Sequence, residues 1–243
     1  MSDPIYAIGD IHGQLGMLQA ALARIEADSG ADARIVFLGD YADRGPNSRG
    51  VLDLLSRAQA QRRNWVFLKG NHDRMFEYFL QTPPREDPYM MVELYWLHPR
   101  LGGDMTLASY GVDARGTRRL MEVHRETLDA VPQAHRDFLQ SLVLTHETDD
   151  LFFVHAGIRG GVSLADQTEM DMLWIRKEFH NDARLHPKLI VHGHTPVDVA
   201  TNYGNRVNLD TGAGYGKPLT AAVFADGEVW QLTDTGRVPL AKP

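Results

Sequence analysis

The feature that most constrains this chain is a short apolar run that ends in glycine and is followed at once by polar residues. It occurs at residues 5–9, at residues 34–39 and at residues 65–70. Segments with apolar residues at helical spacing, residues 14–27 and 48–61, separate these runs. Strands that alternate with helices favour a mainly parallel sheet.

The polar residues after the runs are of kinds that bind metal ions. In chain order the ones that follow such runs are Asp10, His12, Asp40, Asp43, Asn71, His72, His155 and His194. Open α/β sheets bind ligands at the carboxyl ends of their strands, so we expect these side chains to meet at one edge. Asp10 and His12 are two residues apart, and in extended chain they would face the same side and share one ion. Oxygen and imidazole together suit Mn, Fe or Zn better than calcium.

The rest of the chain divides into two stretches. Residues 82–142 contain several prolines and helical patterns, which indicates a helical, cap-like insertion. The C-terminal half is rich in β-type runs, and Asp226-Gly227 between two of them predicts a tight hairpin. We therefore expect one domain over residues 1–243, interrupted by the insertion.

Charge and composition exclude several classes of protein. The chain has 25 Lys and Arg against 32 Asp and Glu, a net charge of -7, which disfavours nucleic acid as a partner. No apolar run approaches the ~20 residues that span a bilayer, so we expect no membrane partner. The absence of cysteine excludes disulfides and thiol nucleophiles, and it fits a cytoplasmic location. Composition says nothing about oligomeric state.

Five blocks together resemble the signature of a known family. They are Gly9-Asp10-Ile11-His12-Gly13, Gly39-Asp40-Tyr41-Ala42-Asp43-Arg44-Gly45, Gly70-Asn71-His72-Asp73, His155-Ala156-Gly157 and Gly193-His194-Thr195. They are similar to those of the phosphoprotein phosphatase family of calcineurin-like metallophosphoesterases. The small size resembles the compact bacterial and phage serine/threonine phosphatases. The resemblance implies an α/β fold, an αββα sandwich of two mixed sheets flanked by helices, with a helical insertion.

The resemblance also implies a centre for two divalent metal ions. Asp10 and His12 would hold the first ion and Asp40 would bridge both. Asn71, His155 and His194 would complete the second site, with His192 left as a packing residue. Mn²⁺ is the first choice for both ions, with Fe or Zn as alternatives.

The remaining site residues would handle substrate and protons. Arg44 and Arg176 would bind the phosphate, and Asp43 and His72 would pair to deliver a proton. Tyr215 lies in a glycine-rich stretch that resembles a loop over the site, so we expect it to line the substrate, a plain hairpin loop being the alternative. The block Gly102-Gly103-Asp104-Met105-Thr106-Leu107 also resembles part of bacterial relatives, without a role that the sequence assigns.

Two ions about 3.5–4 Å apart can activate a bridging hydroxide for direct attack on phosphorus. We therefore expect an enzyme that hydrolyses phosphoserine or phosphothreonine, with phosphotyrosine also considered, in a protein or small phosphoester, without a phosphoenzyme. The alternative is a dinucleoside polyphosphate such as diadenosine tetraphosphate. Hydrolases of that kind tend to lack the acid of the Asp-Arg-Gly block, so Asp43 favours the monoester. A different class, a binding module without activity, would lack a ligand or the proton donor, and neither is missing.

Overall fold

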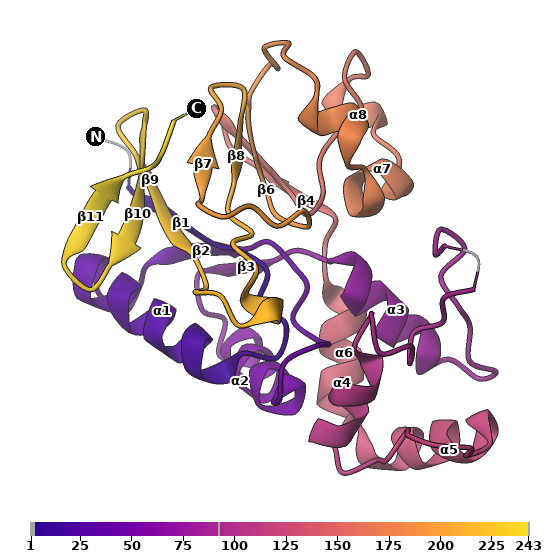
Figure 1. Cartoon of the computed structure of the whole chain (residues 1–243). Coiled ribbons are helices and arrows are strands. Elements are labelled where there is room, and N and C mark those ends of the chain that lie inside the picture. The colour runs from indigo at the N-terminus through magenta and orange to yellow at the C-terminus, as the bar shows by residue number, and fades with distance from the viewer. Residues whose placement is uncertain (1–2, 92, 243) are drawn as a thin grey trace.

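The computed structural model describes residues 3–91 and 93–242, and in it two β-sheets face each other between layers of helices (Figure 1). The first sheet has the strand order β11-β10-β9-β1-β2-β3. β1, β2 and β3 are parallel, while β9 runs antiparallel to β1. Its strands are β1 (Ile5–Ile8), β2 (Arg34–Phe37), β3 (Trp65–Phe67), β9 (Ala221–Ala225), β10 (Glu228–Thr233) and β11 (Gly236–Pro239).

The second sheet has the order β4-β5-β6-β8-β7. β5, β6 and β8 are parallel, and β4 and β7 pair antiparallel at its two edges. Its strands are β4 (Thr145–Glu147), β5 (Leu151–Val154), β6 (Leu189–His192), β7 (Thr201–Asn202) and β8 (Arg206–Asn208). The expected pair of mixed sheets is therefore confirmed, and the N-terminal strands β1, β2 and β3 are parallel, as their alternation with helices predicts.

Alternation of side chains along the buried strands explains the layers. In β1, Tyr6 and Ile8 join the apolar cluster under the helices, while Ile5 and Ala7 join the cluster between the two sheets. Because neighbouring residues of a strand point to opposite faces, a fully apolar strand can serve both clusters. The helices that pack on the outer side of the first sheet are α1 (Leu15–Ser29) and α2 (Ser48–Ala60), and those by the second sheet are α7 (Glu169–Trp174) and α8 (Lys177–His180).

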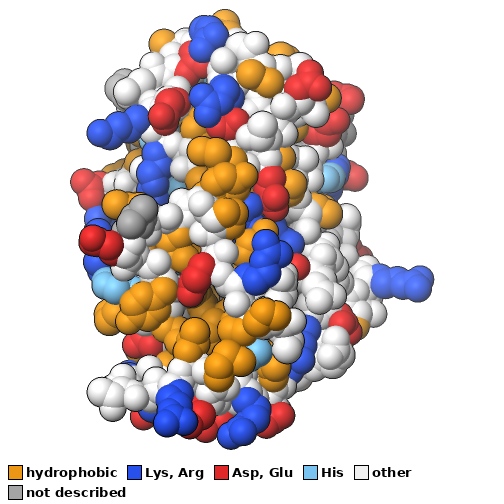
Figure 2. Space-filling model, turned by 90° about the vertical axis from the view of Figure 1, so that its right-hand side faces the viewer, with side chains coloured by type: hydrophobic (Ala, Val, Ile, Leu, Met, Phe, Trp, Pro, Cys, Tyr) orange, Lys and Arg blue, Asp and Glu red, His pale blue; other side chains and the backbone are white. Residues whose placement is uncertain are grey.

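The predicted helical insertion follows α3 (Asn71–Phe79) and contains three helices among its described residues. These are α4 (Gly103–Ser109), α5 (Leu120–Ala130) and α6 (Gln133–Ser141). α4 packs on α2, and α6 packs on both α2 and α3, so the insertion extends the helical layer of the first sheet. Figure 2 shows hydrophobic side chains gathered on the side that lies to the right in Figure 1.

Some elements differ from expectation for local reasons. The hairpin at Asp226-Gly227 joins β9 and β10 as predicted. β7 has only two residues and β11 is exposed throughout, so neither carries the alternating pattern that reveals a strand. α3 begins at Asn71 and not near Met75, because Asp73 accepts the backbone N–H of Gly70 and caps the helix there. Among the described residues, no helix combines the length and the apolarity needed to cross a membrane.

Candidate metal centre

The side chains expected to bind metal lie where strands of both sheets end. β1 precedes Asp10 and His12, β2 precedes Asp40, and β3 leads into Asn71 at the start of α3. The second sheet supplies His155 after β5 and His194 after β6. All six are buried, with at most 5% of their surface exposed. The edge at which they meet is thus formed by two sheets and not by one.

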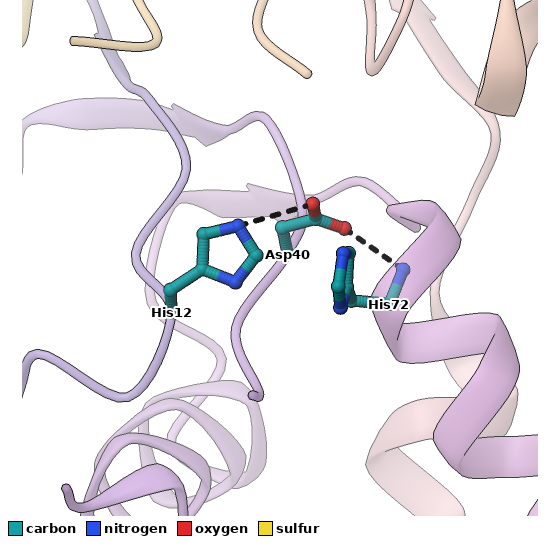
Figure 3. A group of neighbouring side chains, drawn as sticks. All are labelled: His12, Asp40 and His72. Carbon is teal, nitrogen blue, oxygen red and sulfur yellow. Dashed lines mark hydrogen bonds and ion pairs between the residues drawn. The ribbon is translucent and has the colours of Figure 1, made fainter. Parts of the chain in front are cut away.

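Asp40 lies at the centre of this arrangement. Its ligand atoms fall within 4.8 Å of those of His12 and His72 in one group and of His155 and His194 in another. Asp40 Oδ2 is 3.4 Å from His12 Nε2, and Asp40 Oδ1 is 3.5 Å from His155 Nε2. Figure 3 shows the first group, in which the backbone N–H of His72 also donates to Asp40 Oδ1 at 3.0 Å. One carboxylate therefore serves both halves of the site.

Backbone contacts set the orientation of two of the imidazole rings. His12 Nδ1 donates to the carbonyl of Ala42 at 2.9 Å, and His155 Nδ1 donates to that of Leu38 at 2.8 Å. Burial is the largest cause that lowers the pKa of both rings, so each is neutral near pH 7. Their Nε2 atoms then carry the lone pair, which is the form in which histidine binds a metal, and the one on His12 accepts an N–H of Arg44.

The donor set fits a divalent cation. His155 Nε2 faces two oxygens, Asp40 Oδ1 and Asn71 Oδ1, the latter at 3.0 Å. His194 Nδ1 lies 2.9 Å from the same Asn71 oxygen. The lone pair of His155 Nε2 thus faces these oxygens, and a cation between them would stabilise the arrangement. Nitrogen and oxygen donors without thiolate suit Mn, Fe or Zn.

Carboxylates are concentrated here as well. Burial, and then the neighbouring Asp210 and Asp40, raise the pKa of Asp10 well above its usual range. Burial acts to raise the pKa of Asp40 too, but the surrounding histidines outweigh it and hold that pKa below its ordinary value. A bound cation would lower the repulsion among these acids.

The expectation that Asp10 and His12 lie on the same face of an extended chain is wrong. His12 has a φ of 47°, so the backbone turns sharply between the two residues. The Asp10 carboxylate instead accepts the backbone N–H of His194 at 3.0 Å. Gly193 is needed beside it, because a Cβ there would lie 2.0 Å from Asp10 Oδ1. Asp10 thus joins the two sheets, and its relation to His12 is set by the turn.

Two acidic residues that sequence reasoning did not assign also belong to the site. Asp73 accepts the backbone N–H groups of Asp40 and Tyr41 at 2.8 and 2.9 Å, which fixes the loop that carries Asp40. Asp210 is buried after β8, and burial raises its pKa to about 6. The signal for Asp210 was present, because it too follows the end of a parallel strand.

The residues expected to handle protons and phosphate adjoin the ligands. His72 Nδ1 lies 2.6 Å from Asp43 Oδ2. Arg44 donates to His12 Nε2 and, at 3.0 Å, to His72 Nε2. Its guanidinium also lies 4.9 Å from the centre of the Tyr215 ring, which is largely exposed. Tyr215 therefore lies at the mouth of the site, in the short helix η2 (Ala213–Tyr215).

Arg176 approaches from the second sheet's side. Its guanidinium donates to Thr195 Oγ1 at 3.2 Å and to the carbonyl of His194 at 3.3 Å. Burial lowers its pKa from the usual value, although the guanidinium stays charged. His192 lies elsewhere, with its ring 5.0 Å from that of Phe179 under α8. The structure therefore brings together every residue expected in the site and leaves His192 outside it.

Comparison with known proteins places this geometry in a family. Residues 3–218 match the family described as calcineurin-like phosphoesterase. The chain is 27% identical over 257 residues to a bis(5'-nucleosyl)-tetraphosphatase PrpE [asymmetrical] from Anoxybacillus flavithermus, covering 94% of this chain and 93% of that protein. A protein of the same name from Halalkalibacterium halodurans is 27% identical, covering 91% of this chain and 90% of its own length.

Solved structures agree on the fold. A putative diadenosine tetraphosphatase superposes with a TM-score of 0.66 at 20% identity, over 98% of this chain and 94% of its own. A cold-active protein-tyrosine phosphatase of a psychrophilic Shewanella superposes with a TM-score of 0.60 at 17% identity. The match covers 99% of this chain and 81% of that chain. The expected narrower membership, in the phosphoprotein phosphatases, is not what the relatives' names indicate. The chain belongs to the calcineurin-like phosphoesterase family, and it is a hydrolase of the metallophosphoesterase type.

Proposed function

We propose that the protein hydrolyses a phosphoanhydride bond of a dinucleoside polyphosphate, such as diadenosine tetraphosphate. The observation that carries this choice is that relatives named as bis(5'-nucleosyl)-tetraphosphatases align over nearly the whole chain, insertion included. This reverses the preference for a phosphoprotein drawn from Asp43. A proton donor widens the range of leaving groups that a site can expel, and it does not by itself select the substrate.

The ligand set divides naturally into two halves. His12 and Asp40, which the structure groups with His72, would hold one ion, and Asp10 would join them as the family resemblance implies. Asp40, Asn71, His155 and His194 would hold the other, with Mn²⁺ as the first choice for both. Two bound divalent ions supply a Lewis-acid charge and a water of lowered pKa.

The protein's own cations and acid would do the rest. Arg44 contacts His72 and Arg176 contacts Thr195, and their planar guanidinium groups can hold the non-bridging phosphate oxygens as charge develops on them. Tyr215 offers an exposed ring at the mouth against which a nucleobase can stack. With Nδ1 fixed by Asp43, His72 would give a proton from Nε2 to the departing oxygen as the bond to phosphorus breaks, once Arg44 has turned from Nε2 to the phosphate.

A phosphomonoester is the second candidate, and the short contact between His72 and Asp43 favours it. An alkoxide is a poor leaving group and needs a proton, whereas a nucleotide phosphate leaves more readily. A site with this pair can therefore serve both kinds of substrate.

A direct comparison of rates tests the proposal. Purified protein with Mn²⁺ is assayed on diadenosine tetraphosphate, on a phosphoserine peptide and on a cyclic nucleotide. We expect the highest kcat/KM for diadenosine tetraphosphate, with a monophosphate and a triphosphate as products. A higher value for the peptide would establish the second candidate instead, and turnover of the cyclic nucleotide alone would contradict both.

The arginine assignment is tested in the same assay. Arg44→Ala should lower kcat/KM by about 10²-fold, the usual effect of removing one donor to the developing charge. Arg49→Ala is the matched control, because Arg49 is also an arginine close in the chain but lies on α2 and pairs with Asp53 at 3.9 Å. Equal effects of the two substitutions would contradict the role of Arg44.

A further inference from the structure

The carboxylate of Asp43 is held by two residues of the insertion as well as by His72. Thr106 Oγ1 donates to Asp43 Oδ1 at 2.7 Å. The indole N–H of Trp96 donates to Oδ2 at 2.9 Å and also reaches Oδ1 at 3.2 Å. All of these side chains are buried: the exposed fraction is 0% for Asp43 and Thr106, 1% for Trp96 and 3% for His72. Both oxygens of the carboxylate therefore have fixed donors, and solvent does not compete.

Thr106 also fixes the backbone at this point. The N–H of Asp43 donates to Thr106 Oγ1 at 2.7 Å, so one hydroxyl binds both the amide and the carboxylate of the same residue. Asp43 has a φ of 72°, a left-handed conformation that L residues with side chains rarely adopt. Such a conformation persists only where the surroundings enforce it. The hydroxyl of Thr106 contributes to that enforcement, together with that of Ser48, which accepts the same N–H at 3.2 Å.

Trp96 is itself held in place by α3, the helix that begins with the site residues Asn71 and His72. Its ring stacks on Phe76, with centroids 5.0 Å apart and planes within 17°. The preceding residue, Tyr95, is by contrast 49% exposed. Trp96 is thus directed inward from a segment whose neighbouring side chain faces solvent.

The glycines before Thr106 allow the insertion to approach this closely. Gly102 has a φ of 86°, and a Cβ there would lie 2.4 Å from the backbone nitrogen of Arg44. A Cβ on Gly103 would lie 2.6 Å from the ring of Trp96. The block around Gly102, Gly103 and Thr106 therefore fits against the Asp43–Arg44 turn and the indole together.

We propose that Trp96 and Thr106 are positioning residues for proton delivery to the leaving group. They act through Asp43: a carboxylate with donors on both oxygens cannot rotate, and it holds the ring of His72 with Nε2 toward Arg44, 3.0 Å from its guanidinium. The insertion is thereby part of the acid machinery. This inference rests on the role proposed above for His72, and it does not depend on which nucleotide is the substrate.

The experiment uses the dependence of rate on leaving group. Thr106→Val, Trp96→Phe and His72→Asn are assayed with Mn²⁺ on phosphoserine, whose alkoxide needs a proton, and on para-nitrophenyl phosphate, whose phenolate does not. General acid catalysis contributes roughly 10²–10⁴-fold. We expect the two insertion variants to lose about 10-fold or more of kcat on phosphoserine, within that range, and to keep nearly the parent kcat on the aryl ester.

Matched controls separate positioning from packing. Thr127→Val makes the same change at another fully buried threonine of the insertion, whose hydroxyl donates only to the carbonyl of Val123. Trp230→Phe likewise replaces a tryptophan by phenylalanine, on strand β10. Both controls should leave the ratio of the two rates unchanged, and Thr106→Ser should restore the parent ratio. Thermal unfolding of every variant shows whether it is folded. If Thr106→Val does not fold, the inference is decided by Trp96→Phe, which keeps an aromatic ring at that position.

Each result has one meaning. A changed ratio in His72→Asn together with parent ratios in Thr106→Val and Trp96→Phe would overturn the inference and leave the role of His72 intact. An unchanged ratio in His72→Asn itself would overturn that role. An equal loss on both substrates in the insertion variants would show a merely structural effect and also overturn the inference, as would the absence of any alkyl-ester turnover in the parent protein.

Discussion

The strand-end rim and the insertion contribute to one site in different ways. The rim comprises the residues that follow β1, β2, β3, β5 and β6, and it places potential ligands side by side from both sheets. The insertion, residues 82–142, supplies no ligand among its described residues; its side chains reach Asp43 through Trp96 and Thr106, and the carbonyl of Gly102 accepts the backbone N–H of Arg44. Those two side chains contact Asp43, which in turn contacts His72. The rim can hold ions, whereas the insertion can only orient a group that the rim already carries.

The rim and the insertion are therefore held in place by different interactions. Rim side chains follow the ends of their own strands and are held by contacts with the backbone of other strand-end loops, such as the one between His12 and the carbonyl of Ala42. The insertion has its effect only while it is packed on α3 and α2. Damage to the rim should therefore abolish metal binding and turnover together, whereas damage to the insertion should affect stability and proton delivery and spare the metal.

The largest effect should come from Asp40, the carboxylate common to both halves of the rim. Asp40→Asn removes a negative charge that both ligand groups use, so we expect loss of bound metal from both. Metal ions contribute several kcal/mol to the transition state, which corresponds to a fall in turnover of about 10³-fold or more. Elemental analysis and kcat measure the two losses. Asp129→Asn, an exposed acid on α5, is the control, and two ions per chain at the parent rate in Asp40→Asn would contradict the shared role.

The difference between the rim and the insertion also explains which parts of the fold and the site could be predicted from the sequence. The rim was predictable because a glycine at a strand end and an adjacent Asp or His are local, and the paired mixed sheets followed from the resemblance that these blocks carry. Trp96 and Thr106 follow no strand, and their role arises from contacts across 53 and 63 residues of chain. The role of Asp73 could not be predicted because its hydrogen-bond donors are backbone N–H groups, which every residue except proline has.

A buried ion pair joins the insertion to α3, and removing this ion pair should have the next largest effect. Arg74 on α3 binds Asp87 of the insertion through two contacts, of 2.7 and 3.0 Å, and both side chains are at most 2% exposed. Arg74→Met leaves Asp87 as an uncompensated buried charge, which should cost about 3–5 kcal/mol of unfolding free energy. Chemical denaturation measures it.

The double variant Arg74→Met/Asp87→Leu sharpens that test. It replaces both charges with apolar groups, so it should recover most of the lost stability and dock the insertion again. The metal content should stay at the parent value in both variants, because no rim ligand is altered. A double variant no more stable than the single one would show that the pair is not what joins the insertion to α3.

The smallest effect concerns how the insertion is joined to α2, and it depends on pH. His135 on α6 lies between Tyr110, whose hydroxyl is 2.7 Å from Nδ1, and Asp53 of α2, whose Oδ1 is 3.0 Å from Nε2. Burial is the main cause that lowers the pKa of His135, and it outweighs the attraction of Asp53. Between that lowered pKa and the ordinary value of about 6.5, the unfolded chain binds more protons than the folded one. Stability must therefore fall as the pH falls through this window.

His135→Asn removes the titrating group, so its unfolding free energy should depend less on pH than that of the parent between pH 7.5 and 5.5. The rim histidines also have lowered pKa values, but they are present in both proteins and their contribution cancels in the difference. Denaturation at three pH values measures that difference directly. Parallel curves would mean that His135 does not contribute to the pH dependence, which would then arise from other groups such as the rim histidines.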